Sequence, residues 1–129
     1  MNQSPYLKNL KILSMAIKQF EIWMAYLNPQ ISTEAGKTRL VLVVQTNLLN
    51  KLPHPSTIVC PITTNVKKET EILRVHIKKG TADLQKDSDI VIDQLRAIDN
   101  KRLINKIGDL PKTMIAIVKD NIKIMMDIA

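Results

Sequence analysis

The chain has 129 residues, of which 45% are hydrophobic and 24% charged, and its formal net charge is +7. This length allows one globular domain and leaves too little chain for two independent cores. The 3% aromatic content argues against a nucleic-acid platform of several stacked rings. The basic excess favours a polyanionic partner, bound mainly through charge and hydrogen bonds.

Cysteine usage and hydropathy indicate the cellular compartment in which the protein is expected. Cys60 is the only cysteine, so no intrachain disulfide can form, and a reducing cytoplasm is expected. No segment approaches about 20 uninterrupted apolar residues, so we expect no membrane association. The sequence has no Cys/His cluster, Asp-rich loop or phosphate-cradling glycine loop, so no metal ion or other cofactor is expected.

The N-terminal third predicts an extension followed by a strand. Residues 1–18 are interpreted as an N-terminal extension, either helical or outside the true start, since Met15 is an alternative start. Residues 19–129 are expected to form a single domain. Within it, Glu21 to Leu27 predicts a strand that ends at Asn28 and Pro29, because proline fixes φ and lacks an N–H donor.

The middle of the chain predicts further strands. The continuous apolar runs Leu40–Val44 and Thr57–Ile62 are typical of strands buried on both faces. Residues 72–77 alternate and are flanked by lysines, which suits a strand near a sheet edge. Residues 89–92 predict another short strand, and the polar residues of Asp93–Asp99 that follow have no evident structural purpose.

The C-terminal segment predicts a helix that starts near Pro111. Its hydrophobic residues recur at helical spacing and should pack on the sheet or on a partner; they are Met114, Ile115, Ile117, Val118, Ile122, Met125 and Met126. Five or more short strands with a terminal helix describe a small, strongly curved antiparallel β-barrel of the α+β class.

Four segments together resemble the MazF/PemK family of toxins, and the resemblance covers about residues 19–127. They are Glu21–Pro29, Glu34 with Arg39–Val44, Cys60–Thr64 and Asp93–Asp99. The resemblance implies an SH3-like barrel with a C-terminal helix that pairs as a homodimer. It also implies the toxin of a type II toxin–antitoxin pair, a metal-independent, sequence-selective endoribonuclease that leaves 2′,3′-cyclic phosphate and 5′-OH ends on single-stranded RNA.

The same resemblance implies that Arg39, Thr63 and Glu34 are catalytic. Arg39 would neutralise charge on the phosphoryl group, although a salt bridge that closes a loop is an alternative role. Thr63 would donate a hydrogen bond to a phosphoryl oxygen. An arginine stays protonated in proteins, so Glu34 is the more natural general base, while the assignment of base and acid stays open.

Other residues are candidates for contacts with RNA. Gln94 and Arg96 would either bind bases and phosphates or link the barrel to its dimer mate. Further substrate-binding candidates are Thr64 and Asn28, which lie within matched segments, and Lys37, which lies between Glu34 and Arg39. Trp23 is interpreted as a core residue rather than an RNA-stacking one. The two histidines, His54 and His76, are not expected to form a ribonuclease-type acid–base pair.

The chain departs from the family pattern in two places. Ser32 to Ala35 stands where family members carry Gly-Ser-Glu-Gln, and Phe20-Glu21 replaces the usual Gly-Asp before the tryptophan. Two alternatives therefore stay open: a non-catalytic DNA gyrase poison on the same barrel, or a relic that only binds RNA or an antitoxin. For the toxin, the expected partner is an antitoxin whose extended, acidic segment fills the RNA groove.

Overall fold

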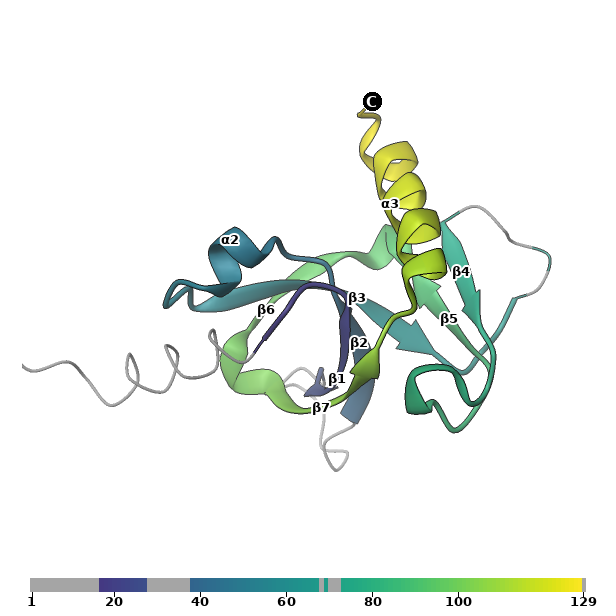
Figure 1. The fold of residues 1–129 in the computed structure, drawn as a ribbon, viewed down its shortest axis with the longest axis horizontal. Helices are drawn as coiled ribbons and strands as arrows, with labels where there is room; N and C mark the ends of the chain where they lie inside the picture. Colours follow the sequence, from purple (N-terminus) through teal and green to yellow (C-terminus); the bar gives the residue numbers. More distant parts are fainter. Residues whose placement is uncertain (1–16, 28–37, 68, 70–72, 129) are drawn as a thin grey trace, which may run out of the picture.

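Seven strands and one long helix make up most of the computed structural model, which describes residues 17–27, 38–67, 69 and 73–128 (Figure 1). The strands are β1 (Glu21–Tyr26), β2 (Thr38–Val43), β3 (Ser56–Thr63), β4 (Arg74–Ile77), β5 (Ser88–Val91), β6 (Arg96–Asp99) and β7 (Leu103–Asp109). The helices are the one-turn α2 (Asn47–Asn50) and the long α3 (Lys112–Met126). Three short 3-10 turns are η1 (Thr81–Asp83), η2 (Ile92–Gln94) and η3 (Asn100–Arg102).

The strands form one antiparallel sheet in the order β4-β5-β3-β2-β1-β7. Strand β3 organises it, because one edge pairs with β2 and the other pairs first with β6 and then with β5. The strands β6, β3, β2, β1 and β7 curl into a ring (Figure 1). Among the described strands β6 and β7 share no ladder, and η3 joins them instead. The expected barrel-like antiparallel fold is thus confirmed. Where the ring lacks a ladder, between β6 and β7, the η3 turn connects the two strands.

The sheet is hydrophobic on both faces, so the single expected core is divided into two clusters. Alternation along β2 sends Val41 and Val43 to one cluster and Leu42 to the other. The first cluster holds Trp23, which is buried and donates its indole N–H to Glu21 Oε1 at 3.0 Å. The prediction that Trp23 is a core residue is confirmed.

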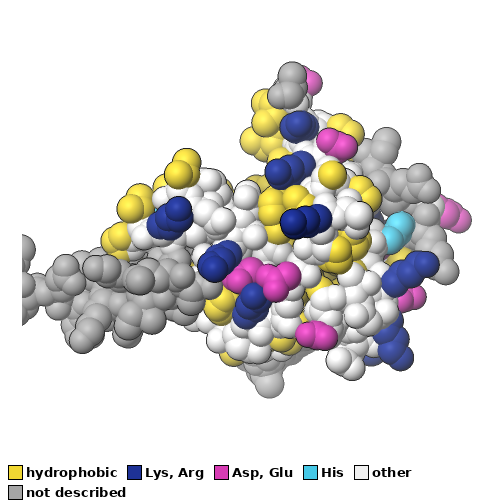
Figure 2. Space-filling model, viewed as in Figure 1, with side chains coloured by type: hydrophobic (Ala, Val, Ile, Leu, Met, Phe, Trp, Pro, Cys, Tyr) yellow, Lys and Arg dark blue, Asp and Glu magenta, His cyan; other side chains and the backbone are white. Residues whose placement is uncertain are grey.

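Helix α3 covers the second cluster with part of its predicted hydrophobic stripe. Val118 is fully buried there, and four partly buried neighbours pack around it: Met114, Ile115, Ile122 and Met125. Ile117 and Met126 are exposed and do not pack on the sheet, so for these two residues packing on a partner stays a prediction. Figure 2 shows hydrophobic side chains at the surface of the projecting helix, because its far turns extend beyond the strands. No helix in the described ranges has the length and apolar character needed to cross a membrane.

Strand β6 corrects the interpretation of Asp93–Asp99. Its register with β3 buries Ile98 in the first cluster. The Asp99 carboxylate accepts a hydrogen bond from the backbone N–H of Lys101 at 2.8 Å and so caps η3. At least part of this polar string therefore has a structural purpose: it turns the chain from β6 into β7.

Phe20 stands at the position where the family carries glycine, and its φ is 68°. This left-handed region strains any residue with a side chain. The Phe20 ring is buried beside Ile22 and Leu42, and Lys119 Nζ lies 5.7 Å from its centroid. Packing therefore offsets the backbone strain.

Phe20→Gly is expected to be more stable than Phe20→Ala by about 1 kcal/mol. Both variants lose the packing of the ring, but glycine alone relieves the left-handed backbone. Urea unfolding of the two proteins measures the difference. An alanine variant as stable as the glycine variant would show that the backbone at residue 20 is not strained.

Gly108 allows β7 to approach η1 closely. A Cβ at this position would lie 2.5 Å from the backbone oxygen of Ala82. Gly108→Ala should push the two segments apart and lower the free energy of unfolding by about 1–3 kcal/mol. Gly80→Ala is the control, since its Cβ would meet no atom within 4 Å and would add only left-handed strain. A Gly108→Ala protein with the urea midpoint of the wild type would contradict the prediction, and Gly80→Ala shows how much loss backbone strain alone produces.

Candidate functional site

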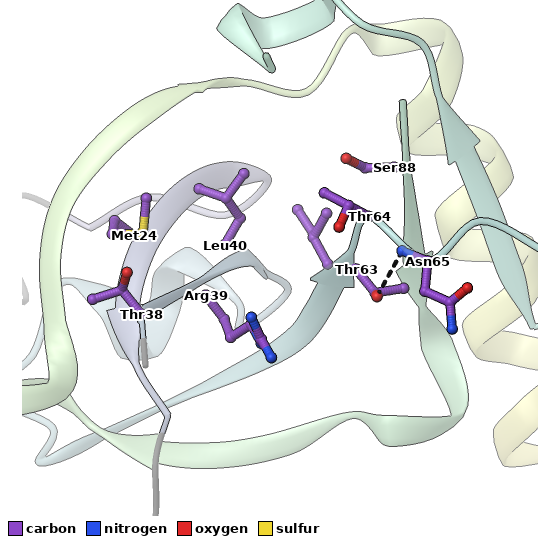
Figure 3. Close-up of a pocket in the computed structure, with 9 residues that line it drawn as sticks. Met24, Thr38, Arg39, Leu40, Thr63, Thr64, Asn65 and Ser88 are labelled. Atoms are coloured by element: carbon purple, nitrogen blue, oxygen red, sulfur yellow. Dashed lines mark hydrogen bonds between the residues drawn. The ribbon is translucent and has the colours of Figure 1, made fainter. Parts of the chain in front are cut away.

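Two of the three predicted catalytic residues lie side by side at the ends of β2 and β3. The register pairs Leu40 with Ile62, so Arg39 and Thr63 are the next residues outward on the two strands. Cross-strand neighbours in an antiparallel pair share one face of the sheet. Both residues line the same hollow, and the Arg39 side chain extends toward β3 (Figure 3). The third, Glu34, lies outside the described residues.

Among the described residues, the polar groups of this pair have few partners. Thr63 Oγ accepts a hydrogen bond from the backbone N–H of Asn65 at 3.1 Å, and this leaves its own O–H to donate (Figure 3). Arg39 is exposed and pairs with no acidic side chain in the described part of the chain. The loop that a salt bridge of Arg39 would close lies outside the described residues, so that alternative stays open.

Three hollows adjoin through shared lining residues, with Arg39 and Thr63 in the central one, and we refer to them together as the groove. The hollow beside them on the β6 side is lined by Gln94 and Arg96, and it shares Arg39 and Thr63 with the central hollow. Thr64 belongs to the central hollow and to a third one, where Gln85 and Lys86 lie. The predicted substrate-binding residues Gln94, Arg96 and Thr64 are therefore brought together, whereas Lys37 and Asn28 lie outside the described residues.

Sequence reasoning missed several residues that line this groove: Thr38, Asn65, Gln85, Lys86 and Ser88. Lys86 had a weak signal, since it is a cation in a polar stretch just before a strand. The others are common polar residues with no distinctive pattern. Thr38 directly precedes Arg39 on β2, whereas Asn65, Gln85 and Ser88 reach the groove only through the pairing of distant strands.

A buried carboxylate lies behind Thr63. Asp89 is fully buried, and its Oδ2 accepts hydrogen bonds from the Lys67 backbone N–H at 3.0 Å and from Arg74 Nη1 at 2.9 Å. Its Oδ1 contacts His76 Nδ1. Burial alone would raise the pKa of Asp89, but these hydrogen bonds outweigh it and lower that pKa. Asp89 is therefore held as a carboxylate.

Neither histidine lines the three hollows of this groove. His54 Nδ1 lies 2.6 Å from the backbone oxygen of Ser56, and His76 contacts Asp89. Within the described ranges no three His, Cys, Asp or Glu side chains cluster closely enough to hold a metal ion. Cys60 is buried in β3, and burial raises the pKa of its thiol to about 12.

The curved sheet and its terminal helix have the fold of solved structures that are titled as MazF toxins. The structure matches Mycobacterium tuberculosis toxin MazF-mt6 with a TM-score of 0.69 and 24% identity, over 84% of this chain and 98% of that one. It matches MazE-MazF from Deinococcus radiodurans with a TM-score of 0.74 and 17% identity, over 88% and 97%.

The sequence comparisons narrow the class to a family. A sequence model described as "PemK-like, MazF-like toxin of type II toxin-antitoxin system" matches residues 18–126. The chain is 32% identical over 112 residues to Endoribonuclease EndoA of Bacillus subtilis (strain 168), covering 87% of this chain and 96% of that protein. It is 34% identical over 97 residues to Endoribonuclease MazF of Staphylococcus epidermidis, covering 75% and 80%. The chain therefore belongs to the PemK-like, MazF-like toxin family, as its motifs indicated.

Proposed function

We propose that this chain is a metal-independent, sequence-selective endoribonuclease that cuts single-stranded mRNA and serves as the toxin of a toxin–antitoxin pair. The observation that carries the proposal is the pairing of Arg39 and Thr63 near the middle of an open groove. Two relatives at 32% and 34% identity bear the name endoribonuclease, which supports the same activity here.

The proposed reaction is a transesterification within the RNA. The 2′-oxygen bonds to phosphorus while the bond from phosphorus to the 5′-oxygen breaks, which gives a 2′,3′-cyclic phosphate and a 5′-OH end. A base must take the proton of the 2′-hydroxyl, and an acid must give one to the 5′-oxygen. Glu34 is our candidate base on sequence grounds alone.

Arg39 and Thr63 would stabilise the charge that builds on the phosphoryl oxygens. The guanidinium presents a fork of donors that suits two oxygens at once. The Thr63 O–H is left to donate because its oxygen already accepts from Asn65. Donors held in place before the reaction stabilise the transition state without having to reorganise during it. In this proposal the arginine supplies the positive charge that a metal ion supplies in other nucleases.

The flanks of the groove would hold the nucleotides on either side of the cut. Gln94 and Arg96 lie at one end and Gln85 and Lys86 at the other, so each end offers an amide and a cation. Amides suit base edges, and cations suit phosphates. Thr64, together with Lys37 and Asn28 on sequence grounds, would add contacts that contribute to the choice of sequence.

The same groove would accept the antitoxin. A solved relative is titled "Endoribonuclease in complex with its cognate antitoxin from Mycobacterial species". We propose that an extended, acidic antitoxin segment occupies the groove of this chain and so excludes RNA, since the chain carries a net charge of +7. A homodimer in the cytoplasm is the proposed working form.

The test is to incubate the purified protein with a long single-stranded RNA in excess EDTA and to identify the new ends by mass spectrometry. Discrete cuts that end in cyclic phosphate would support the proposal. Intact RNA with a folded protein would overturn it. Inhibition of gyrase supercoiling would then indicate the non-catalytic poison, and RNA binding without cleavage would indicate the relic.

A further inference from the structure

Thr63, Asp89 and His76 form a row across three neighbouring strands. The register sets Thr63 of β3 opposite Asp89 of β5, and Asp89 opposite His76 of β4. Residues that oppose one another in antiparallel strands share one face of the sheet. The row therefore runs from the central hollow toward the β4 edge, with a carboxylate in its middle.

A buried aspartate at this strand position is costly. Asp89 is fully buried and precedes Ile90 and Val91, which are also buried. An apolar residue would fill such a position without desolvating a charge, and buried ion pairs add little net stability. Stability alone therefore does not explain why a carboxylate occupies the row next to Thr63.

The contacts of Asp89 reach the turn that follows Thr63. The Asp89 carboxylate accepts from the Lys67 N–H at one end of the turn. It also holds Arg74, whose Nη1 donates to the backbone oxygen of Asn65 at 3.0 Å. Asn65 in turn donates its N–H to Thr63 Oγ. Hydrogen bonds on either side of the Asn65 backbone thus link Asp89 to the hydroxyl in the groove.

We propose that Asp89, acting through Arg74, is a positioning residue that fixes the direction in which the Thr63 hydroxyl donates. This inference rests on the proposed function. Without the carboxylate, Arg74 loses its anchor and no longer holds the Asn65 carbonyl, so the φ and ψ angles of Asn65 are less restrained and its N–H no longer fixes the Thr63 oxygen. The RNA would still bind, but the phosphoryl oxygens would lose an oriented donor.

Kinetics of single and double variants test the proposal. Asp89→Asn is expected to lower kcat about 10- to 100-fold while KM changes less than about 3-fold, because misplacement of a reacting group affects the transition state more than binding. In a Thr63→Val background the same change should alter kcat less than about 2-fold, because the hydroxyl that it positions is absent. Equal losses of kcat in both backgrounds would overturn the proposal.

Further variants separate positioning from loss of fold. Asp87→Asn is the matched control, since Asp87 is exposed and its carboxylate accepts a hydrogen bond from the Lys79 N–H. Arg74→Gln keeps the Asp89 contacts to His76 and Lys67 and removes the link to Asn65. It should therefore reproduce the loss of kcat, and it is the test variant to use if Asp89→Asn does not fold. An Arg74→Gln protein with unchanged kcat would overturn the proposal.

Hydrogen exchange supplies a readout that needs no activity. The Asn65 amide hydrogen should exchange at least about 10-fold faster in Asp89→Asn and in Arg74→Gln than in the wild type. Its exchange rate should be unchanged in Asp87→Asn. Unchanged exchange at Asn65 in both test variants would overturn the positioning role. A wild-type protein that leaves RNA intact would overturn the proposed function instead, and the exchange data would then decide alone whether Asp89 holds the turn.

Discussion

Arg39→Ala is expected to slow RNA cleavage about 10²- to 10³-fold, because it removes the donors placed to stabilise charge on the phosphoryl oxygens. Arg39 is exposed at the end of β2 and packs in neither hydrophobic cluster. The variant should therefore keep the melting temperature of the wild type. Cleavage of a fluorescent single-stranded RNA under single-turnover conditions measures the effect on the chemical step.

Arg39→Lys is the informative companion to this variant. It keeps the charge but loses the fork that binds two oxygens, so it should recover only part of the lost rate. A substitution at Arg102, whose Nη1 donates to the backbone oxygen of Tyr26, controls for loss of a cation elsewhere on the surface. If Arg39→Ala cuts at the wild-type rate, the groove around Arg39 and Thr63 is not the catalytic site.

The strands with a regular burial pattern, including the edge strand β4, were predictable from sequence, whereas β7 and the short helix α2 were not. Strands β2 and β3 are buried on both faces, so they appear as continuous apolar runs. In β7 only Leu103 is buried among seven residues, and its register with β1 shifts twice, so no period of two survives in the sequence. The four residues of α2 are too few to show a helical period.

The residues of the candidate site also divide into those that could be predicted from the sequence and those that could not. Arg39 and Thr63 were identified through the family resemblance, because each stands at a fixed place beside a recognisable strand. Asp89 was treated as the edge of a short strand, since nothing local shows that Arg74 and Thr63 lie beside it. Such a network exists only once β4, β5 and β3 pair, and sequence spacing does not contain that information.

Asp89→Asn is also expected to lower the free energy of unfolding by about 3 kcal/mol at pH 7, because it removes the anion from a buried ion pair. This energy comes mainly from the ion pair with Arg74, whose side chain is 16% exposed. The contact with His76 contributes little, because that side chain is 38% exposed and more screened by solvent. Urea unfolding of the variant beside the wild type measures it, with Asp87→Asn again as control.

The pH dependence of this loss follows from the direction of the pKa shift. The folded-state pKa of Asp89 lies below its ordinary value of 3.8, so its carboxylate stabilises the fold fully above that value. The stabilisation is lost as the pH falls through the lowered pKa. The difference between wild type and Asp89→Asn should therefore be largest near neutral pH and shrink below pH 3.8. A difference that grows as the pH falls would mean that Asp89 is protonated in the folded state, and that Arg74 is anchored by another group.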